Sequence, residues 1–379
     1  MKQNTFRRLL DFDLHSRRSA GLGDRIHVDF ILLFLLFFIS AYGLVILYSA
    51  VGQDLDAVTA QIIKIIVAAV VMLIVAQISP FFYLRTAWWL FISGVLLLVV
   101  VYFYGYEVNG SKRWLRIPGL IGFQPSELMK LVLPMVLAWY FHERRLPPHS
   151  VHIFWALLMI AVPTGLIFLQ PDLGTALIIS TSGILVLLLA GVPWRIVFGA
   201  LGLCAVSAPA IWFLLLDYQQ RRILTFLNPE SDPLGDGWNI IQSKTAIGSG
   251  GLTGKGLFEG TQSHLDFLPE SRTDFIIAVL AEELGLIGVI VLLFLYILLI
   301  ARGTIIAIQA QSTFNRLLAG TITFTFFVYV FVNIGMVSGV VPVVGVPLPL
   351  VSFGGTSIVT LFAGFGILMS IQTHRRIMS

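Results

Sequence analysis

The sequence has little charge and almost no cysteine. Of its 379 residues, 12% are charged and 57% are hydrophobic, whereas soluble domains carry about 25% charged residues. This deficit of charge, together with long apolar runs, indicates a polytopic membrane protein. The one cysteine, Cys204, excludes an intrachain disulfide and a cysteine metal cluster. The net charge of +4 is small, and we expect no nucleic-acid partner.

Signatures of several common enzyme classes are also missing. The sequence contains no HExxH motif, no Cys/His metal set and no plausible Ser/His/Asp arrangement, so a zinc or nucleophile mechanism is unsupported. The glycine-rich run at 247–256 fails the P-loop pattern, because Ser249 stands where Gly should be and Gly256 follows Lys255 where Ser or Thr should be. We interpret this run as tight turns, although its backbone N–H groups could still bind an anion.

Ten apolar stretches approach the roughly 20 residues that a membrane-crossing helix needs. Their expected spans are 28–50, 58–78, 86–105, 126–142, 151–169, 173–190, 194–216, 275–301, 315–341 and 354–372. The predicted fold class is therefore all-α, a polytopic membrane protein with ten transmembrane helices. We divide the chain into a basic cytoplasmic segment (1–27), seven helices (28–216), a large external loop (217–273), and three helices with a short cytoplasmic tail (274–379).

The distribution of Lys and Arg predicts the orientation. With the N-terminus in the cytoplasm, cytoplasmic segments hold 14 of the 24 basic residues, which favours both termini inside. The first 27 residues are too long and too charged for the n-region of a signal peptide, and the first apolar run is long enough to span the membrane, so that run should be an uncleaved anchor.

Eight basic residues lie in two external loops, 106–125 and 217–273, against this trend. Either they meet an anionic partner, or long loops translocate regardless of their charge. In the segment 112–116, Lys112, Arg113, Trp114 and Arg116 place three cations and an indole within five residues. That density favours phosphate binding, with the indole at the membrane interface.

Ionisable residues also fall inside the predicted helices. Glu127 and Lys130 are three residues apart and share a helix face. They could form an ion pair in which the two charges neutralise each other within the helix. Intramembrane charges usually face a cavity or another helix, however, and we favour a position that lines a cavity. Asp172 could cap the helix at 173–190 or line the same cavity, and both interpretations stay open. We assign Lys64 to snorkelling towards the surface.

Asp274 is the best isolated catalytic candidate, because it lies at the external mouth of the eighth predicted helix. It could instead cap that helix, a role that Thr273 could fill equally. On an ideal helix Glu282 and Glu283 lie about 80° and 180° around from Asp274 and ~12–13 Å deeper. Both cannot face one narrow cavity with Asp274, and we treat them as structural candidates.

Several motifs together resemble the signature of the SEDS family (shape, elongation, division and sporulation). The runs Asn333–Gly339 and Gly345–Ser357, with Pro342 between them, carry most of the likeness. Further matching stretches are Arg113–Trp114, 123–127, 170–175, 242–244, 246–251, 273–275 and 281–285. The resemblance extends from about Asp29 to the C-terminus. The loop sequences at 228–235 and 260–263 are more similar to those of family members that act in cell elongation than to those of members that act in cell division.

The resemblance implies a ten-helix peptidoglycan glycosyltransferase of the bacterial cytoplasmic (inner) membrane. Such an enzyme polymerises lipid II on the external face during cell elongation and releases polyprenyl pyrophosphate. It works with a class B penicillin-binding protein and other elongation machinery. Asp274 matches the proposed catalytic aspartate of the family. Two departures are visible: Arg272 stands where His is common, and Phe353 where Tyr is common, so we assign no hydrogen-bonding role to Phe353.

We hypothesise that Asp274 is the general base, with a pKa raised towards neutrality in a partly dry cavity. Cations would hold the pyrophosphate. The expected substrate-binding residues are Arg113, Trp114, Gln124, Glu127, Lys130, Asp172, Lys244 and Ser352. No cofactor is identified with certainty; a divalent cation could share the work, but no ligand set defines a metal site. The alternatives are a lipid II flippase and a non-enzymatic scaffold for the penicillin-binding protein.

Overall fold

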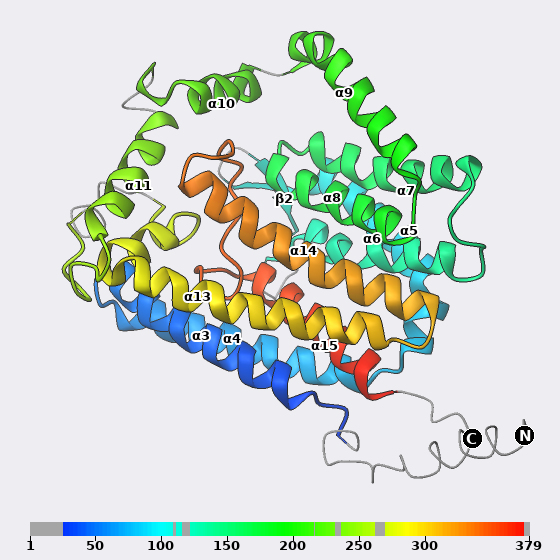
Figure 1. The fold of residues 1–379 in the computed structure, drawn as a ribbon, viewed down its shortest axis with the longest axis horizontal. Coiled ribbons are helices and arrows are strands. Elements are labelled where there is room, and N and C mark those ends of the chain that lie inside the picture. Colours follow the sequence, from blue (N-terminus) through cyan, green and yellow to red (C-terminus); the bar gives the residue numbers. More distant parts are fainter. Residues whose placement is uncertain are drawn as a thin grey trace, which may run out of the picture.

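The structure is a computed structural model that describes residues 26–108, 111–115, 122–215, 217–231, 236–261 and 270–374. Most of the basic N-terminal segment, Arg116, and parts of the loop sequences at 232–235 and 262–263 lie outside the described residues. The described chain is almost entirely helical (Figure 1). The predicted all-α polytopic fold is therefore confirmed.

Twelve α-helices and one short 3-10 helix form the described part of the chain. In order they are α3 (Phe30–Ala50), α4 (Leu55–Gln77), α5 (Pro80–Tyr104), α6 (Pro125–His142), α7 (Ser150–Phe168), α8 (Leu173–Leu189), α9 (Trp194–Leu214), α10 (Asp217–Leu227), η1 (Pro229–Ser231), α11 (Asp236–Gly250), α13 (Ile276–Gln309), α14 (Thr313–Val337) and α15 (Thr356–Thr373). A small antiparallel hairpin, β1 (Tyr106–Val108) and β2 (Ser111–Trp114), adds the one pair of strands among these residues. This hairpin was not predicted from the sequence.

Each of the ten predicted apolar stretches is a helix, and two helix ends differ from the prediction by six residues or more. Helix α5 begins six residues early, because Pro80 suits the first helical position. Helix α13 extends to Gln309, eight residues beyond the prediction. Its continuation is possible because Arg302 finds a partner inside the fold: its Nε donates to Asp29 Oδ2 at 3.1 Å.

The chain is a multi-pass membrane protein by the length and composition of its helices. Seven described helices are long and apolar enough to cross a membrane: α3, α4, α5, α7, α13, α14 and α15. Helix α8 and the apolar part of α9 are shorter. Helix α6 has 18 residues and carries Glu127 and Lys130. The count of ten crossings, their orientation and the four-part division of the chain stay predictions.

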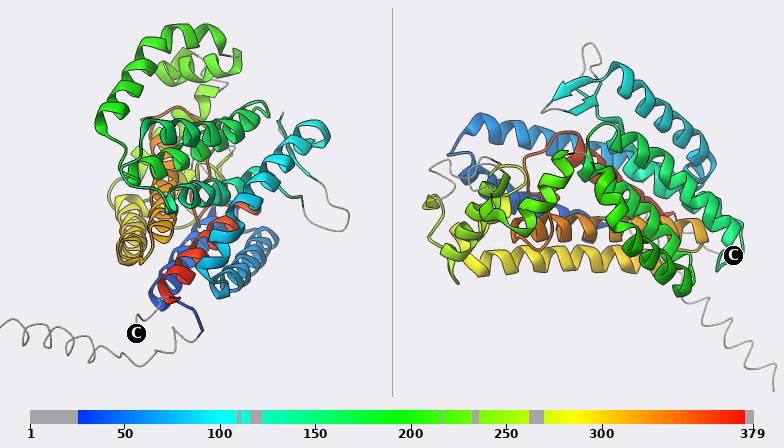
Figure 2. Two further views of the ribbon diagram at one scale, coloured as in Figure 1. Left: turned by 90° about the vertical axis from the view of Figure 1, so that its right-hand side faces the viewer. Right: turned by 90° about the horizontal axis from the view of Figure 1, so that it is seen from above.

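Most of the helices form one bundle, α9 projects from it, and the helices of the large loop lie at one end (Figure 1). Helix α15 packs along α4, α5 along α6, and α13 along both α3 and α14. Helix α6 lies at the centre, and most of its residues are buried. The region predicted as a large external loop is largely helical: α10 and α11 lie beside the end of the bundle where α13 begins (Figures 1 and 2).

A break in α13 joins this loop region to the bundle. Gly285 interrupts the helix with φ +64° and ψ −163°. The turn after α11 inserts at the break, where Lys255 N donates to Glu282 O and Gly256 N to Glu283 O, both at 3.0 Å. In return, backbone N–H groups just beyond Gly285 donate to carbonyl groups of the turn. The break therefore leaves these backbone groups paired, as a membrane protein requires.

The glycines of the run at 247–256 are explained by this insertion. The run begins as the last turn of α11 and continues as turns with positive φ at Gly251, Gly254 and Gly256. A Cβ on Gly254 would lie 2.1 Å from Glu283 O. Only glycine fits so close a backbone approach at positive φ. The run thus serves helix packing, in agreement with the tight turns predicted for it.

Candidate active site

A polar cavity of about 440 Å³ lies where α13 begins. Its walls come from β2, the N-terminal ends of α6 and α8, the turn before α13, and the loop between α14 and α15. Of the nine site residues expected from the sequence, seven line this cavity: Arg113, Trp114, Gln124, Glu127, Lys130, Asp172 and Asp274. The fold thus brings together residues that are as far as 161 positions apart in the chain.

Asp172 both caps a helix and lines the cavity, so the two open interpretations hold together. Its side chain accepts from the backbone N–H of Thr175 at 3.1 Å, at the start of α8. Gln124 Nε2 donates to its Oδ2 at 3.1 Å, and an Arg113 guanidinium nitrogen lies 3.3 Å from the same oxygen. Asp172 is buried and therefore fixes Gln124 and Arg113 at the cavity wall.

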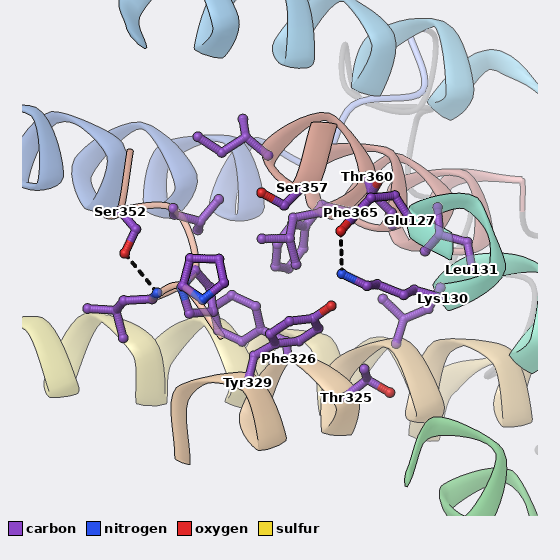
Figure 3. Close-up of a pocket in the computed structure, with 18 residues that line it drawn as sticks. Glu127, Lys130, Leu131, Thr325, Phe326, Tyr329, Ser352, Ser357, Thr360 and Phe365 are labelled. Atoms are coloured by element: carbon purple, nitrogen blue, oxygen red, sulfur yellow. Dashed lines mark hydrogen bonds and ion pairs between the residues drawn. The ribbon is translucent and has the colours of Figure 1, made fainter. Parts of the chain in front are cut away.

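Glu127 and Lys130 likewise form an ion pair and line the cavity. Lys130 Nζ lies 2.6 Å from Glu127 Oε1 and 5.2 Å from the centre of the Tyr329 ring. Figure 3 shows the pair at the edge of a second, mostly apolar cavity that adjoins the first. Glu127 Oε2 is buried with no hydrogen-bond donor among the described residues. The pair therefore has capacity to bind a further polar group.

Three successive carbonyl groups before α13 are held by donors from the C-terminal part of the chain. Phe353 N donates to the carbonyl of Arg272 at 2.9 Å, and Ser352 Oγ to that of Thr273 at 2.5 Å. Asn333 Nδ2 donates to the carbonyl of Asp274 at 2.8 Å. These bonds fix the backbone beneath Asp274, which explains why the motif at 333–357 is needed beside it.

Two expected substrate-binding residues do not line the polar cavity. Ser352 borders the apolar cavity instead, where it donates to Thr273 O and accepts from Leu348 N at 2.8 Å (Figure 3). Lys244 is exposed on α11. A Cβ on Gly339 would lie 2.3 Å from its Cε, so Lys244 packs on the loop after α14. Direct substrate contact by either residue stays a prediction.

The carboxyl group of Asp274 is only partly exposed and does not cap its helix. The N-cap of α13 is Phe275, without a side-chain bond, and Thr273 Oγ1 donates to Glu270 instead. The pKa of Asp274 is raised to about 6, first by burial and then by the nearby Glu270 charge, against the lowering effect of Arg113 and Arg222. A carboxyl group with this pKa exchanges protons near neutral pH.

Glu282 and Glu283 both lie away from the cavity, whereas their helical angles predicted only that they could not both face it together with Asp274. Glu282 Oε1 accepts from Lys255 Nζ at 2.6 Å and from Thr261 N at 2.8 Å. Glu283 Oε1 accepts from Ser49 Oγ at 2.5 Å. These contacts fasten the loop after α11 and helix α3 to α13, which is a structural role.

Lys64 is partly buried and has an aromatic partner, while its predicted snorkelling to the surface stays a prediction. Its Nζ lies 3.7 Å from the centre of the Phe353 ring, a cation–π distance. One turn away, Gln61 Nε2 donates to Ser352 O at 3.2 Å, and its Oε1 accepts from Gly354 N at 3.3 Å. Helix α4 therefore holds the loop between α14 and α15, which borders the cavity, through Gln61 and Lys64.

Among the polar residues of the cavity wall that the sequence analysis did not assign to the site are Arg222, Glu270 and Tyr329. Arg222 was visible as one external cation among several, and Glu270 had no distinguishing pattern. Tyr329 lies in the apolar run that forms α14 and gave no signal. Within the part of the chain that the structure describes, no group of three His, Cys, Asp or Glu side chains could hold a metal ion.

Comparison with protein families gives a match over residues 29–377, to the family FtsW, RodA and SpoVE, described as cell cycle proteins. The chain is 50% identical over 357 residues to the peptidoglycan glycosyltransferase MrdB of Escherichia coli K12, covering 94% of this chain and 96% of that protein. It is 42% identical over 287 residues to the probable peptidoglycan glycosyltransferase FtsW of Geobacter metallireducens, covering 74% and 75%.

Solved structures are similar over most of their length. One chain from work on a peptidoglycan synthase complex that coordinates polymerization and crosslinking has a TM-score of 0.81 and 32% identity, covering 92% of this chain and 99% of that one. The crystal structure of the rod shape determining protein RodA of Thermus thermophilus has a TM-score of 0.69 and 29% identity, covering 91% and 96%.

Proposed function

The chain belongs to the FtsW, RodA and SpoVE family, and from that premise we propose that it is a peptidoglycan glycosyltransferase of cell elongation. Its substrate is lipid II, which it polymerises on the external face of the bacterial cytoplasmic membrane. The observation that carries the proposal is the carboxyl group of Asp274, with a pKa near 6, in a cavity that also holds Arg113 and Lys130.

Asp274 is the general base of the transfer. It takes the proton from the 4-hydroxyl of the acceptor sugar, whose oxygen forms a bond to the anomeric carbon of the donor. The bond from that carbon to the pyrophosphate oxygen breaks, and its electron pair leaves with polyprenyl pyrophosphate. A single displacement of this kind inverts the anomeric carbon.

The cavity wall near β2 supports a pyrophosphate site. Arg113 Nε and Trp114 Nε1 are buried and have no acceptor among the described residues. Both are hydrogen-bond donors only, so an anionic oxygen would satisfy them. Arg222 adds a second guanidinium to the same cavity. Donors fixed before the reaction stabilise the charge that develops on the leaving group.

A class B penicillin-binding protein is the proposed partner. The similar chain at TM-score 0.81 comes from work on a complex that couples polymerization to crosslinking. A polymerase that delivers strands outside the membrane needs such a crosslinking enzyme beside it. The motif resemblance to elongation members supports the same pairing.

Purified protein in lipid II-containing liposomes, with and without the partner, tests this function. We expect polymerised glycan chains on a gel. Movement of lipid II across the bilayer without chains would favour a flippase, since polar groups within helices also suit transport. Partner binding with neither movement nor chains would favour a scaffold.

A further inference from the structure

A third, smaller cavity adjoins Asp274 on the side of α10 and α11. It has a volume of about 160 Å³ and lies below the range of about 300–1,000 Å³ typical of pockets for drug-sized ligands. Asp274, Arg222, Glu270 and Gly345 line both this cavity and the larger one. The carboxyl group of Asp274 therefore stands at the boundary between two spaces.

The two cavities differ in the side chains that they do not share. The larger one has Arg113 and Lys130, which suit an anion. The smaller one has the hydroxyl of Thr225, the amide of Asn239 and apolar side chains, among them Phe275. Neutral hydrogen-bonding groups around an apolar wall suit an uncharged sugar ring better than a pyrophosphate.

Asn239 has an unused acceptor in this cavity. Its Oδ1 atom is buried and receives no hydrogen bond in the part of the chain that the structure describes. Thr225 is buried beside the same space. A buried acceptor without a donor is unfavourable, and a sugar O–H or an acetamido N–H would supply the donor.

We propose that this smaller cavity is the acceptor subsite, which holds the sugar whose 4-hydroxyl attacks, while the larger cavity holds the pyrophosphate-linked donor. The inference rests on the glycosyltransferase function proposed above. An inverting displacement needs the nucleophile and the leaving group on opposite faces of the anomeric carbon, with the base beside the nucleophile. Asp274, bordering both cavities, takes the acceptor proton as the C–O bond forms and the pyrophosphate leaves into the larger cavity.

The test separates the two substrates chemically. A lipid II analogue with hydrogen in place of the 4-hydroxyl of the outer sugar can act only as donor. An analogue with a methylene group in place of the anomeric oxygen can act only as acceptor. The coupled product of the two is measured with the full-length purified protein, each analogue being varied while the other is kept in excess.

Asn239→Ala and Thr225→Val should each raise the KM for the acceptor analogue about tenfold and change the KM for the donor analogue less than about twofold, since tenfold corresponds to the loss of one useful hydrogen bond. Thr245→Val is the matched control. Thr245 is exposed on α11 and bonds to its own helix, so both KM values should stay unchanged.

An unchanged donor KM in the variants also reports that the protein is folded. Equal increases for both analogues, or an increase for the donor alone, would overturn the assignment of the smaller cavity. A wild-type protein that couples no analogues and polymerises no lipid II would instead refute the glycosyltransferase function itself.

Discussion

The rate of polymerisation should depend on pH through Asp274. A general base acts in its deprotonated form, so activity falls as pH falls. With the pKa of Asp274 at about 6, about 91% of the free enzyme is competent at pH 7 and about 9% at pH 5. The value of kcat/KM, which reports the pKa values of the free enzyme, should therefore fall about tenfold between pH 7 and pH 5. An aspartate of ordinary pKa, about 3.9, would show almost no loss over this range.

Glu270→Gln tests whether neighbouring charge contributes to the raised pKa of Asp274, and so to the fall in activity at low pH (the acid limb of the pH profile). The Glu270 charge raises the pKa of Asp274, so its removal should move the acid limb to lower pH. Glu270 is exposed, and exposed charge pairs contribute about 0–1 kcal/mol, while one pKa unit corresponds to about 1.4 kcal/mol. We expect a shift of about half a unit or less.

Initial rates of lipid II polymerisation, measured from about pH 5 to about pH 8, give both profiles. Glu230→Gln is the matched control, because Glu230 is exposed and borders neither cavity at Asp274. Its profile should match that of the wild type. A wild-type rate that stays level down to pH 5, or a limb that moves to higher pH in Glu270→Gln, would refute the reasoning.

Three further substitutions probe the support of the site. Asn333→Ala removes the bond to the Asp274 carbonyl; kcat should fall about tenfold with little change in KM, and an unchanged kcat would contradict this. Gly250→Ala would place a Cβ 1.9 Å from Ala281 O, so thermal unfolding should show a loss of about 1–3 kcal/mol, and no loss would argue against the inserted turn. Arg113→Lys loses the planar donors; the KM for lipid II should rise about tenfold, and an unchanged KM would speak against the pyrophosphate site.

The helices could be predicted because their apolar runs are continuous. A helix that crosses a membrane pairs its own backbone groups, so composition and length are enough to find it. The end of α13 could not be predicted, because the charged residue Arg302 interrupts the apolar run. Its partner, Asp29, lies 273 positions away, and such pairing is invisible to a local pattern.

Part of the site could also be predicted from local patterns. The spacing of Glu127 and Lys130 places them on one helix face, and Asp172 follows a proline at a helix start. The approach of Arg222 and Glu270 to Asp274 depends on the path of the long loop, which no periodicity encodes. The sequence analysis assigns Ser352 to substrate binding, because the residue lies in the family motif. The structure shows that its hydroxyl holds the backbone next to Asp274.

The most direct test of the central claim is lipid II polymerisation by purified protein, wild type against Asp274→Ala, in the presence of the penicillin-binding partner. The account predicts glycan chains from the wild type and none from a folded, partner-bound Asp274→Ala protein. Chains made by Asp274→Ala at the wild-type rate would contradict the assignment of Asp274 as the general base.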